Sequence, residues 1–170
     1  MKFTRTLIAS CNKGDTPSVL YHLAKGANVN GSDSRGWFPL GGAVYGQHEE
    51  VVKLLIEFGA DINQESNCRW TPLYIAAWKG YGDIAKILLK CGAQTKTKTI
   101  ADYNSPNGYT ALHIAAEQGY CDVVKTLLKF GAEVNPRDGD GYTPLDRAAQ
   151  NRQRVVEKCL KKRGGKHSKK

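Results

Sequence analysis

The sequence lacks the long hydrophobic runs that cross membranes. No apolar stretch approaches the roughly 18 to 20 residues needed to span a bilayer, so we expect no membrane segment. The opening MKFTRTLIASC is also too short and too polar for a secretory signal peptide, whose apolar core has about 7 to 15 residues. These absences lead us to expect a non-secreted chain of 170 residues, about one domain.

Cysteine pairs are missing as well. The five cysteines are odd in number and widely spaced, there is no C-x-x-C, and no histidine stands at a metal-ligand spacing from them. They lie at positions 11, 68, 91, 121 and 159. We therefore expect reduced thiols in a reducing compartment and no metal site.

Signatures of catalysis are absent too. The chain has no G-x-x-x-x-G-K-[ST], G-x-S-x-G, H-E-x-x-H or dinucleotide fingerprint. His22, His48 and His113 are scattered rather than grouped with a nucleophile. The sequence therefore predicts a protein that is not an enzyme and that needs no cofactor.

What is present in excess is positive charge at one end. Residues 152–170 hold nine Lys or Arg and one acid, Glu157, whereas residues 1–151 hold 16 basic and 15 acidic side chains. The main body is therefore nearly neutral, and we expect residues 161–170 to form a basic, disordered tail. Such a tail can contact nucleic acid or act as a nuclear-import signal, which gives a second candidate function.

An internal repeat organises the rest of the chain. Leu40, Leu73, Leu112 and Leu145 are separated by 33, 39 and 33 residues. The glycines at 26, 59, 92 and 131 are separated by 33, 33 and 39 residues. Both series contain the same six-residue excess, so one insertion lies between Ala93 and Thr110.

The repeated segments resemble the ankyrin repeat. The similarity is carried by TPLYIAAWKGYGDIAKILLKCGA (71–93), TALHIAAEQGYCDVVKTLLKFGAEVN (110–135), FPLGGAVYGQHEEVVKLLIEFGADIN (38–63) and TPLDRAAQNRQRVVEKCL (143–160). A degenerate copy occupies 7–30. The resemblance implies an all-α solenoid, in which pairs of antiparallel helices are joined by β-hairpin fingers.

We expect five repeats within a domain of residues 1–160. Their approximate bounds are 4–32, 33–65, 66–98, 99–137 and 138–160. Repeat one lacks the TPL motif and repeat five lacks the closing GA, which are typical of capping repeats and favour a complete, small, monomeric array.

The residues of each repeat predict its local structure. Thr71 and Pro72 should begin a helix, and Gly80 should end it. Ala76 and Ala77 keep that helix thin so that neighbours can approach, and stacking buries what one repeat cannot bury alone.

Two departures from the pattern could be functional. Gly41, Gly42 and Gly46 weaken a helix in repeat two, either as a tolerated defect or to let a partner approach closely. The insertion around TKTIADYNSPN (97–107) is either a solvated loop or a partner contact.

The resemblance also implies which positions face a partner: the residues around the G-x-T-P-L glycine and those after the alanine pair. Aromatic residues hold most of these positions, and they would form a row of rings roughly 30 Å long at about 10 Å per repeat. We therefore predict a partner-binding surface of Trp37, Tyr45, Trp70, Trp78, Tyr109 and Tyr142, centred on Trp70 and Trp78, with Arg35, Asn67, Cys68 and Lys79 as its polar rim.

Three functions remain open at this point. The first is binding of another protein as a scaffold module, and the second is nucleic-acid or nuclear-import association through Lys161–Lys170. The third is an adaptor or inhibitor that regulates an enzyme, including an effector delivered into a host cell by an intracellular pathogen. We expect a cytoplasmic or nuclear location. ADIN (60–63) also resembles the finger sequence that asparaginyl hydroxylases modify, with Asn63 as the target.

Overall fold

The computed structural model describes residues 2–100 and 107–168. Within these ranges the chain forms ten helices and no strands. In chain order they are α1 Lys2–Lys13, α2 Thr16–Ala24, α3 Pro39–Tyr45, α4 Glu49–Glu57, α5 Pro72–Lys79, α6 Gly82–Lys90, α7 Ala111–Gln118, α8 Cys121–Lys129, α9 Pro144–Gln150 and α10 Arg154–Lys162. No described helix is long and apolar enough to cross a membrane.

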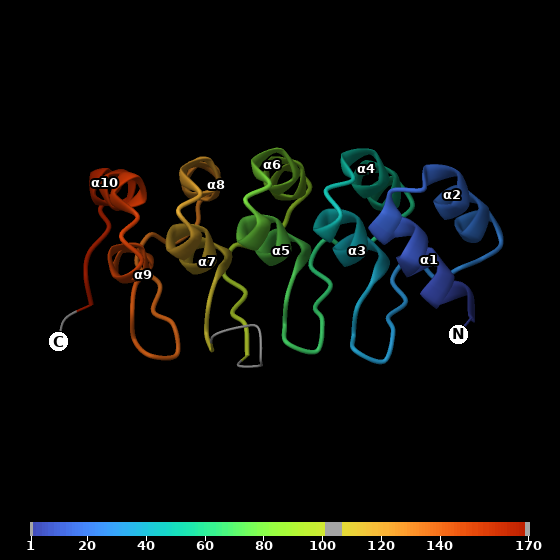
Figure 1. Cartoon of the computed structure of the whole chain (residues 1–170), viewed down its shortest axis with the longest axis horizontal. Coiled ribbons are helices and arrows are strands. Elements are labelled where there is room, and N and C mark those ends of the chain that lie inside the picture. The colour runs from blue at the N-terminus through green and yellow to red at the C-terminus, as the bar shows by residue number, and fades with distance from the viewer. Residues whose placement is uncertain (1, 101–106, 169–170) are drawn as a thin grey trace.

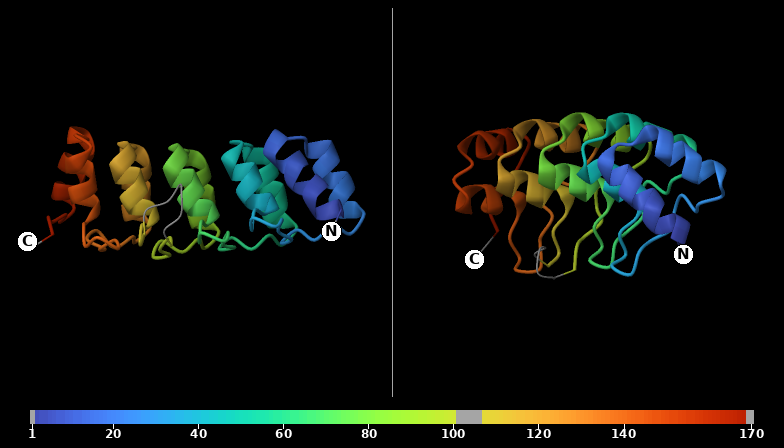
Figure 2. Two further views of the ribbon diagram at one scale, coloured as in Figure 1. Left: turned by 60° about the horizontal axis from the view of Figure 1, so that its bottom comes forward. Right: turned by 45° about the vertical axis from the view of Figure 1, so that its right-hand side comes forward.

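The helices form five consecutive pairs arranged in two layers. The odd-numbered helices lie in one layer and the even-numbered helices in the other (Figure 1). Loops, here called fingers, extend from the odd-numbered layer, and the chain ends lie at opposite ends of the array. Figure 2 shows the same layers from two other directions. We call a helix pair with the finger before it a unit, numbered one to five.

Unit three shows how the sequence produces this shape. The Thr71 side chain accepts a hydrogen bond from the Tyr74 backbone N–H at 3.1 Å, which caps α5, and Pro72 is its first residue. Gly80 ends α5 in the left-handed region, with φ of 77°. Ala76 and Ala77 are fully buried between neighbouring units. The predicted start and end of this helix are therefore confirmed.

The core runs continuously between the layers and along the stack. The four leucines that revealed the repeat each have 1% of their surface exposed (Leu40, Leu73, Leu112 and Leu145). One cluster of buried apolar side chains runs from α1 to α10, so each unit buries its apolar surface against its neighbours.

The fingers are not the predicted β-hairpins. Each begins with a short polar side chain that accepts the backbone N–H of the aromatic residue ending the finger, as in Asp33 to Trp37 at 2.9 Å and Ser66 to Trp70 at 3.1 Å. One backbone hydrogen bond, such as Ser66 N–H to Trp70 C=O at 3.1 Å, closes the turn. The backbone N–H of the aromatic residue donates to this side chain and is therefore not available for a second backbone hydrogen bond of a β-ladder. A turn forms in place of paired strands.

The insertion extends the fourth finger. Its base is closed by the Thr99 N–H to Tyr109 C=O bond of 2.9 Å, which spans ten residues where the other fingers span four. The Ile100 N–H also donates to the Cys68 carbonyl of the preceding finger at 3.2 Å. Residues 101–106, most of the predicted contact loop, lie outside the described residues.

Asparagine side chains link successive fingers. The Asn30 carboxamide donates to the Gly59 carbonyl at 3.2 Å and accepts from the Asp61 N–H at 2.8 Å. Asn63 makes the same pair of contacts with Gly92 and Gln94, and Asn135 makes it with Gly164 and Lys166. Lys96 holds the equivalent position in unit three, and the described residues show no such link between units three and four.

The glycines of unit two are explained by neighbouring parts of the same chain. Gly41 and Gly42 are buried. A Cβ on Gly42 would lie 2.6 Å from Asn12 Oδ1, and one on Gly41 would lie 3.0 Å from the Phe38 ring. Close packing of α1 therefore requires the small residue at 42, and a partner cannot reach either position.

The end of unit five corrects a second prediction. Gly164 has φ of 84°, and the Gly165 N–H bonds to the Leu160 carbonyl as the Ala132 N–H bonds to that of Leu127. Gly164–Gly165 is therefore a closing pair, 33 residues after Gly131–Ala132.

The segment that follows was predicted to be a disordered tail from residue 161. Instead, α10 continues to Lys162, and residues beyond it contact unit five. The Ser168 N–H and the His167 ring bond to the Asp146 carboxylate at 2.8 Å and 2.7 Å. Residues 169 and 170 lie outside the described residues.

Candidate functional site

A concave pocket of about 800 Å³ opens where the fingers of units two and three meet the ends of the odd-numbered helices. We call it the aromatic pocket. It is lined by Asn12, Arg35, Trp37, Tyr45, Gly46, Ser66, Cys68, Trp70 and Trp78. All three tryptophans of the chain therefore line one cavity.

The rings of the pocket touch one another in sequence. The Trp37 and Tyr45 centroids are 5.8 Å apart with the rings edge to face, and those of Tyr45 and Trp78 are 6.1 Å apart. Trp78 then meets Trp70 at 5.2 Å. Tilted and edge-to-face arrangements at these distances are the favourable ones for aromatic pairs. The rings consequently enclose a hollow rather than forming a flat surface.

Repeat geometry brings these rings together. Trp37 and Trp70 end their fingers, where Asp33 and Ser66 hold the backbone N–H of each tryptophan. Tyr45 and Trp78 come from the other side, on the last turns of α3 and α5. Each unit thus supplies one ring from its finger and one from its helix, and stacking two such units closes the pocket.

Two cations lie at or beside the pocket, and Asn12 and Ser66 contribute polar oxygens to its lining. The Lys79 ammonium lies 4.1 Å from the Tyr45 centroid and 4.5 Å from that of Trp78, a cation–π geometry. Arg35 stands at the mouth with 87% of its side chain exposed. Trp70 has 8% of its surface exposed, and its buried Nε1 has no hydrogen-bond partner in the described part of the chain.

The predicted row of rings does not continue into units four and five. Tyr109 is 1% exposed, and its hydroxyl donates to the Glu117 carboxylate from within the stack. Burial and this contact raise the pKa of Tyr109 above its ordinary value. Tyr109 occupies the predicted repeat position, but its ring is closed to a partner.

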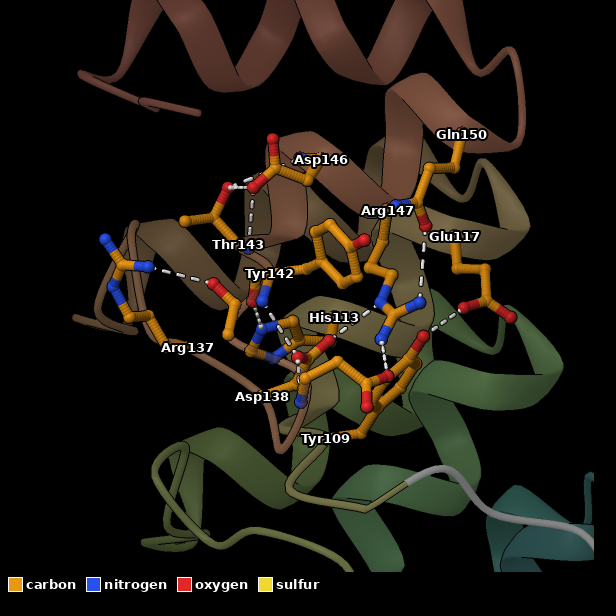
Figure 3. Close-up of polar contacts among 12 residues, drawn as sticks. Tyr109, His113, Glu117, Arg137, Asp138, Tyr142, Thr143, Asp146, Arg147 and Gln150 are labelled. Carbon is orange, nitrogen blue, oxygen red and sulfur yellow. Dashed lines mark hydrogen bonds and ion pairs between the residues drawn. The ribbon is translucent and has the colours of Figure 1, made fainter. Parts of the chain in front are cut away.

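In units four and five, Arg147 packs against the aromatic rings that were predicted to face a partner (Figure 3). Its guanidinium lies between two rings, 5.0 Å from the Tyr109 centroid and 4.7 Å from that of Tyr142. Its Nε forms an ion pair with the Asp138 carboxylate and its Nη2 forms one with that of Asp140, each at 2.7 Å. We call this set the Arg147 network. Because its charges are already paired, it has less to offer a partner than the aromatic pocket.

His113 is part of the scaffold and not of a catalytic group. It is fully buried, its Nδ1 accepts from the Thr110 N–H at 3.2 Å, and its Nε2 lies 3.1 Å from the Tyr142 carbonyl. The Nε2–H therefore donates, which makes the ring a neutral tautomer. Burial lowers the pKa of His113 to about 4. Residues 2–100 and 107–168 contain no cluster of His, Cys, Asp and Glu able to hold a metal.

The structure therefore brings together one part of the predicted surface. Trp37, Tyr45, Trp70, Trp78, Arg35 and Cys68 line the pocket, and Lys79 packs on its rings. Tyr142 is 37% exposed but belongs to the Arg147 network, and Asn67 is exposed on a fingertip beside Gly36.

Two pocket residues, Asn12 and Ser66, were not predicted from the sequence. Asn12 occupies in unit one the position that Tyr45 and Trp78 hold in their units, and its Oδ1 lies 3.5 Å from the Trp37 Nε1. Counting back 33 residues from Tyr45 would have found it. Ser66 carries no such signal, because it is the first residue of a finger. Gly46, which the sequence marked as a position where a partner could approach closely, does line the pocket.

Comparison with known proteins identifies a family. A family model described as ankyrin repeats in three copies matches residues 7–99 and again residues 98–169. No curated protein matches the chain.

Proposed function

Because the chain belongs to the ankyrin-repeat family, we propose that it is a non-catalytic interaction module that binds another protein at its aromatic pocket. The observation that carries this proposal is the gathering of all three tryptophans around one open cavity. Tryptophan, tyrosine and arginine are the commonest anchors of protein interfaces, and the pocket presents all three.

The scaffold supports this role. A stack of short, capped helices loses little conformational freedom on binding, so more of the contact energy appears as affinity. An adaptor or an enzyme inhibitor would use the same surface, and the identity of the partner separates these two roles.

The test is affinity capture with a matched pair of aromatic substitutions. Trp78→Ala removes a half-buried ring of the pocket, and Tyr142→Ala removes a more exposed ring from the Arg147 network. We expect Trp78→Ala to weaken a captured partner by roughly 30-fold, since a central anchor contributes about 2 kcal/mol or more, and Tyr142→Ala to retain it. If circular dichroism shows both variants to be folded and both lose the partner to the same extent, the partner does not bind at the aromatic pocket.

A second candidate function uses the outer surface of unit five. Arg154, Lys158, Lys161 and Lys162 are exposed along α10, where Glu157 is the sole acid. A surface of this kind can bind phosphates, and its affinity for duplex DNA should fall steeply with salt. Replacing Lys158 and Lys162 with Glu should abolish such binding and leave partner capture through the pocket unchanged.

A further inference from the structure

The two cations at the aromatic pocket, Lys79 and Arg35, have no close anionic partner. Lys79 packs on two aromatic rings, and the described residues form no ion pair with it. The Arg35 Nε lies 3.9 Å from Asp33, at the limit of an ion pair, and its side chain is 87% exposed. Arg35, which lines the pocket, and Lys79, which packs on two of its rings, are therefore available to a negatively charged group.

The Trp70 indole forms an apolar wall of the pocket. The residue has 8% of its surface exposed, and its Nε1 is itself buried, so a ligand in the pocket meets the face of the ring and not the N–H. The pocket thus combines apolar walls with the two cations beside them.

We propose that the aromatic pocket binds an acidic segment of the partner protein, with one large apolar side chain among the rings and a neighbouring carboxylate at Lys79 and Arg35. This inference rests on the proposed function and specifies the chemistry of the partner. A basic segment fits poorly, because Lys79 already occupies the cation site over Tyr45 and Trp78.

A single-stranded nucleic acid also combines negative charge with flat rings, but the geometry favours a peptide. Stacked bases need parallel, separated platforms along a basic groove. The rings here are inclined by 83° between Trp37 and Tyr45, 42° between Tyr45 and Trp78, and 58° between Trp70 and Trp78. They surround a single side chain better than a row of bases.

Tryptophan fluorescence, excited at a wavelength that tyrosine does not absorb, reports on the pocket because all three tryptophans of the chain line it. The probes are three capped peptides without tryptophan or tyrosine. The first contains Leu-Phe between pairs of Glu, the second contains Leu-Phe between pairs of Lys, and the third contains Gly-Ser between pairs of Glu. We expect a saturable change in emission with the first peptide and none with the other two.

Substitution of the lysine tests the site of the carboxylate. Lys79→Met keeps the length of the side chain and removes its charge, and we expect it to weaken the acidic Leu-Phe peptide roughly three- to tenfold. Lys86→Met removes an exposed lysine from α6, in the other layer, and should leave binding unchanged. Circular dichroism and melting temperature establish that both variants are folded.

Each contrary outcome has a distinct meaning. Equal binding of the Lys-flanked peptide, or no effect of Lys79→Met, overturns the acidic preference and leaves the pocket as a partner site. Tighter binding of single-stranded oligothymidylate, in competition with the peptide, replaces the protein partner with a nucleic acid. If no peptide binds and Trp78→Ala retains captured protein, both this inference and the proposed function fail.

Discussion

At the scale of single residues, three side chains adopt a backbone conformation that the other units reserve for glycine. Gln47, Arg69 and Arg152 have φ of 62°, 60° and 58°. Position 152 corresponds to Gly80 and Gly119, which end α5 and α7 with φ of 77° and 84°. A side chain in this region costs about 1 to 2 kcal/mol because Cβ crowds the following carbonyl.

Arg152→Gly should therefore raise the free energy of unfolding by about 0.5 to 1 kcal/mol, measured by urea denaturation. Arg152→Ala is the matched control, because it removes the same charge but keeps Cβ. We expect alanine to leave stability nearly unchanged. Equal effects of the two substitutions would show that charge rather than backbone strain limits stability here.

The buried ring of His113 makes stability depend on pH. Burial lowers its pKa in the folded state to about 4, against 6.5 for the exposed group. The unfolded chain therefore takes up the proton first as pH falls. The contribution of the neutral ring is complete above about pH 6.5 and declines toward about pH 4, by up to about 1.4 kcal/mol for each pH unit.

Urea denaturation at several pH values between 4 and 7 measures this decline. Burial by itself raises the pKa of Asp146, but hydrogen bonds from Thr143, Ser168 and His167 lower it below its ordinary value. The contribution of the Asp146 carboxylate to folding stability is therefore lost only at a pH below this range. His113→Gln should have a flatter profile than the parent protein. An unchanged slope in the variant would assign the pH dependence to other groups.

At the scale of elements, the helices were predictable because their signals are local. Thr71 and Pro72 begin α5 and Gly80 ends it, all within one stretch of sequence. The conformation of the fingers was not predictable, because each turn depends on which backbone N–H the Asp33 or Ser66 side-chain oxygen accepts. The same limit applies to Tyr109, whose burial depends on Glu117 and on Arg147 from the following unit.

The asparagine links between fingers give a prediction at this scale. Lys96→Asn should create the missing link from unit three to the Gly131 carbonyl and the Glu133 N–H, and so raise the free energy of unfolding by about 0.5 to 1.5 kcal/mol. Lys96→Ala, which removes the charge without offering a carboxamide, is the control. A gain of the same size with alanine would remove the asparagine explanation.

At the scale of the whole molecule, the array divides into two chemically different halves. Units two and three carry the aromatic pocket, and units four and five carry the Arg147 network. The boundary coincides with the inserted finger and with the unlinked position Lys96. Repetition predicted every unit, but it could not predict this division, because the division arises from the residues that break the repeat.

The basic residues of unit five lie at one extremity of an elongated molecule (Figure 1). Residues 152–168 carry seven Lys or Arg and one Glu, while the rest of the described chain is close to neutral. The protein therefore has a large electric dipole along its long axis, and anionic surfaces will draw it in with the α10 end leading. In this orientation the aromatic pocket would not face the anionic surface. The protein could therefore bind such a surface through α10 and a protein partner through the pocket at the same time.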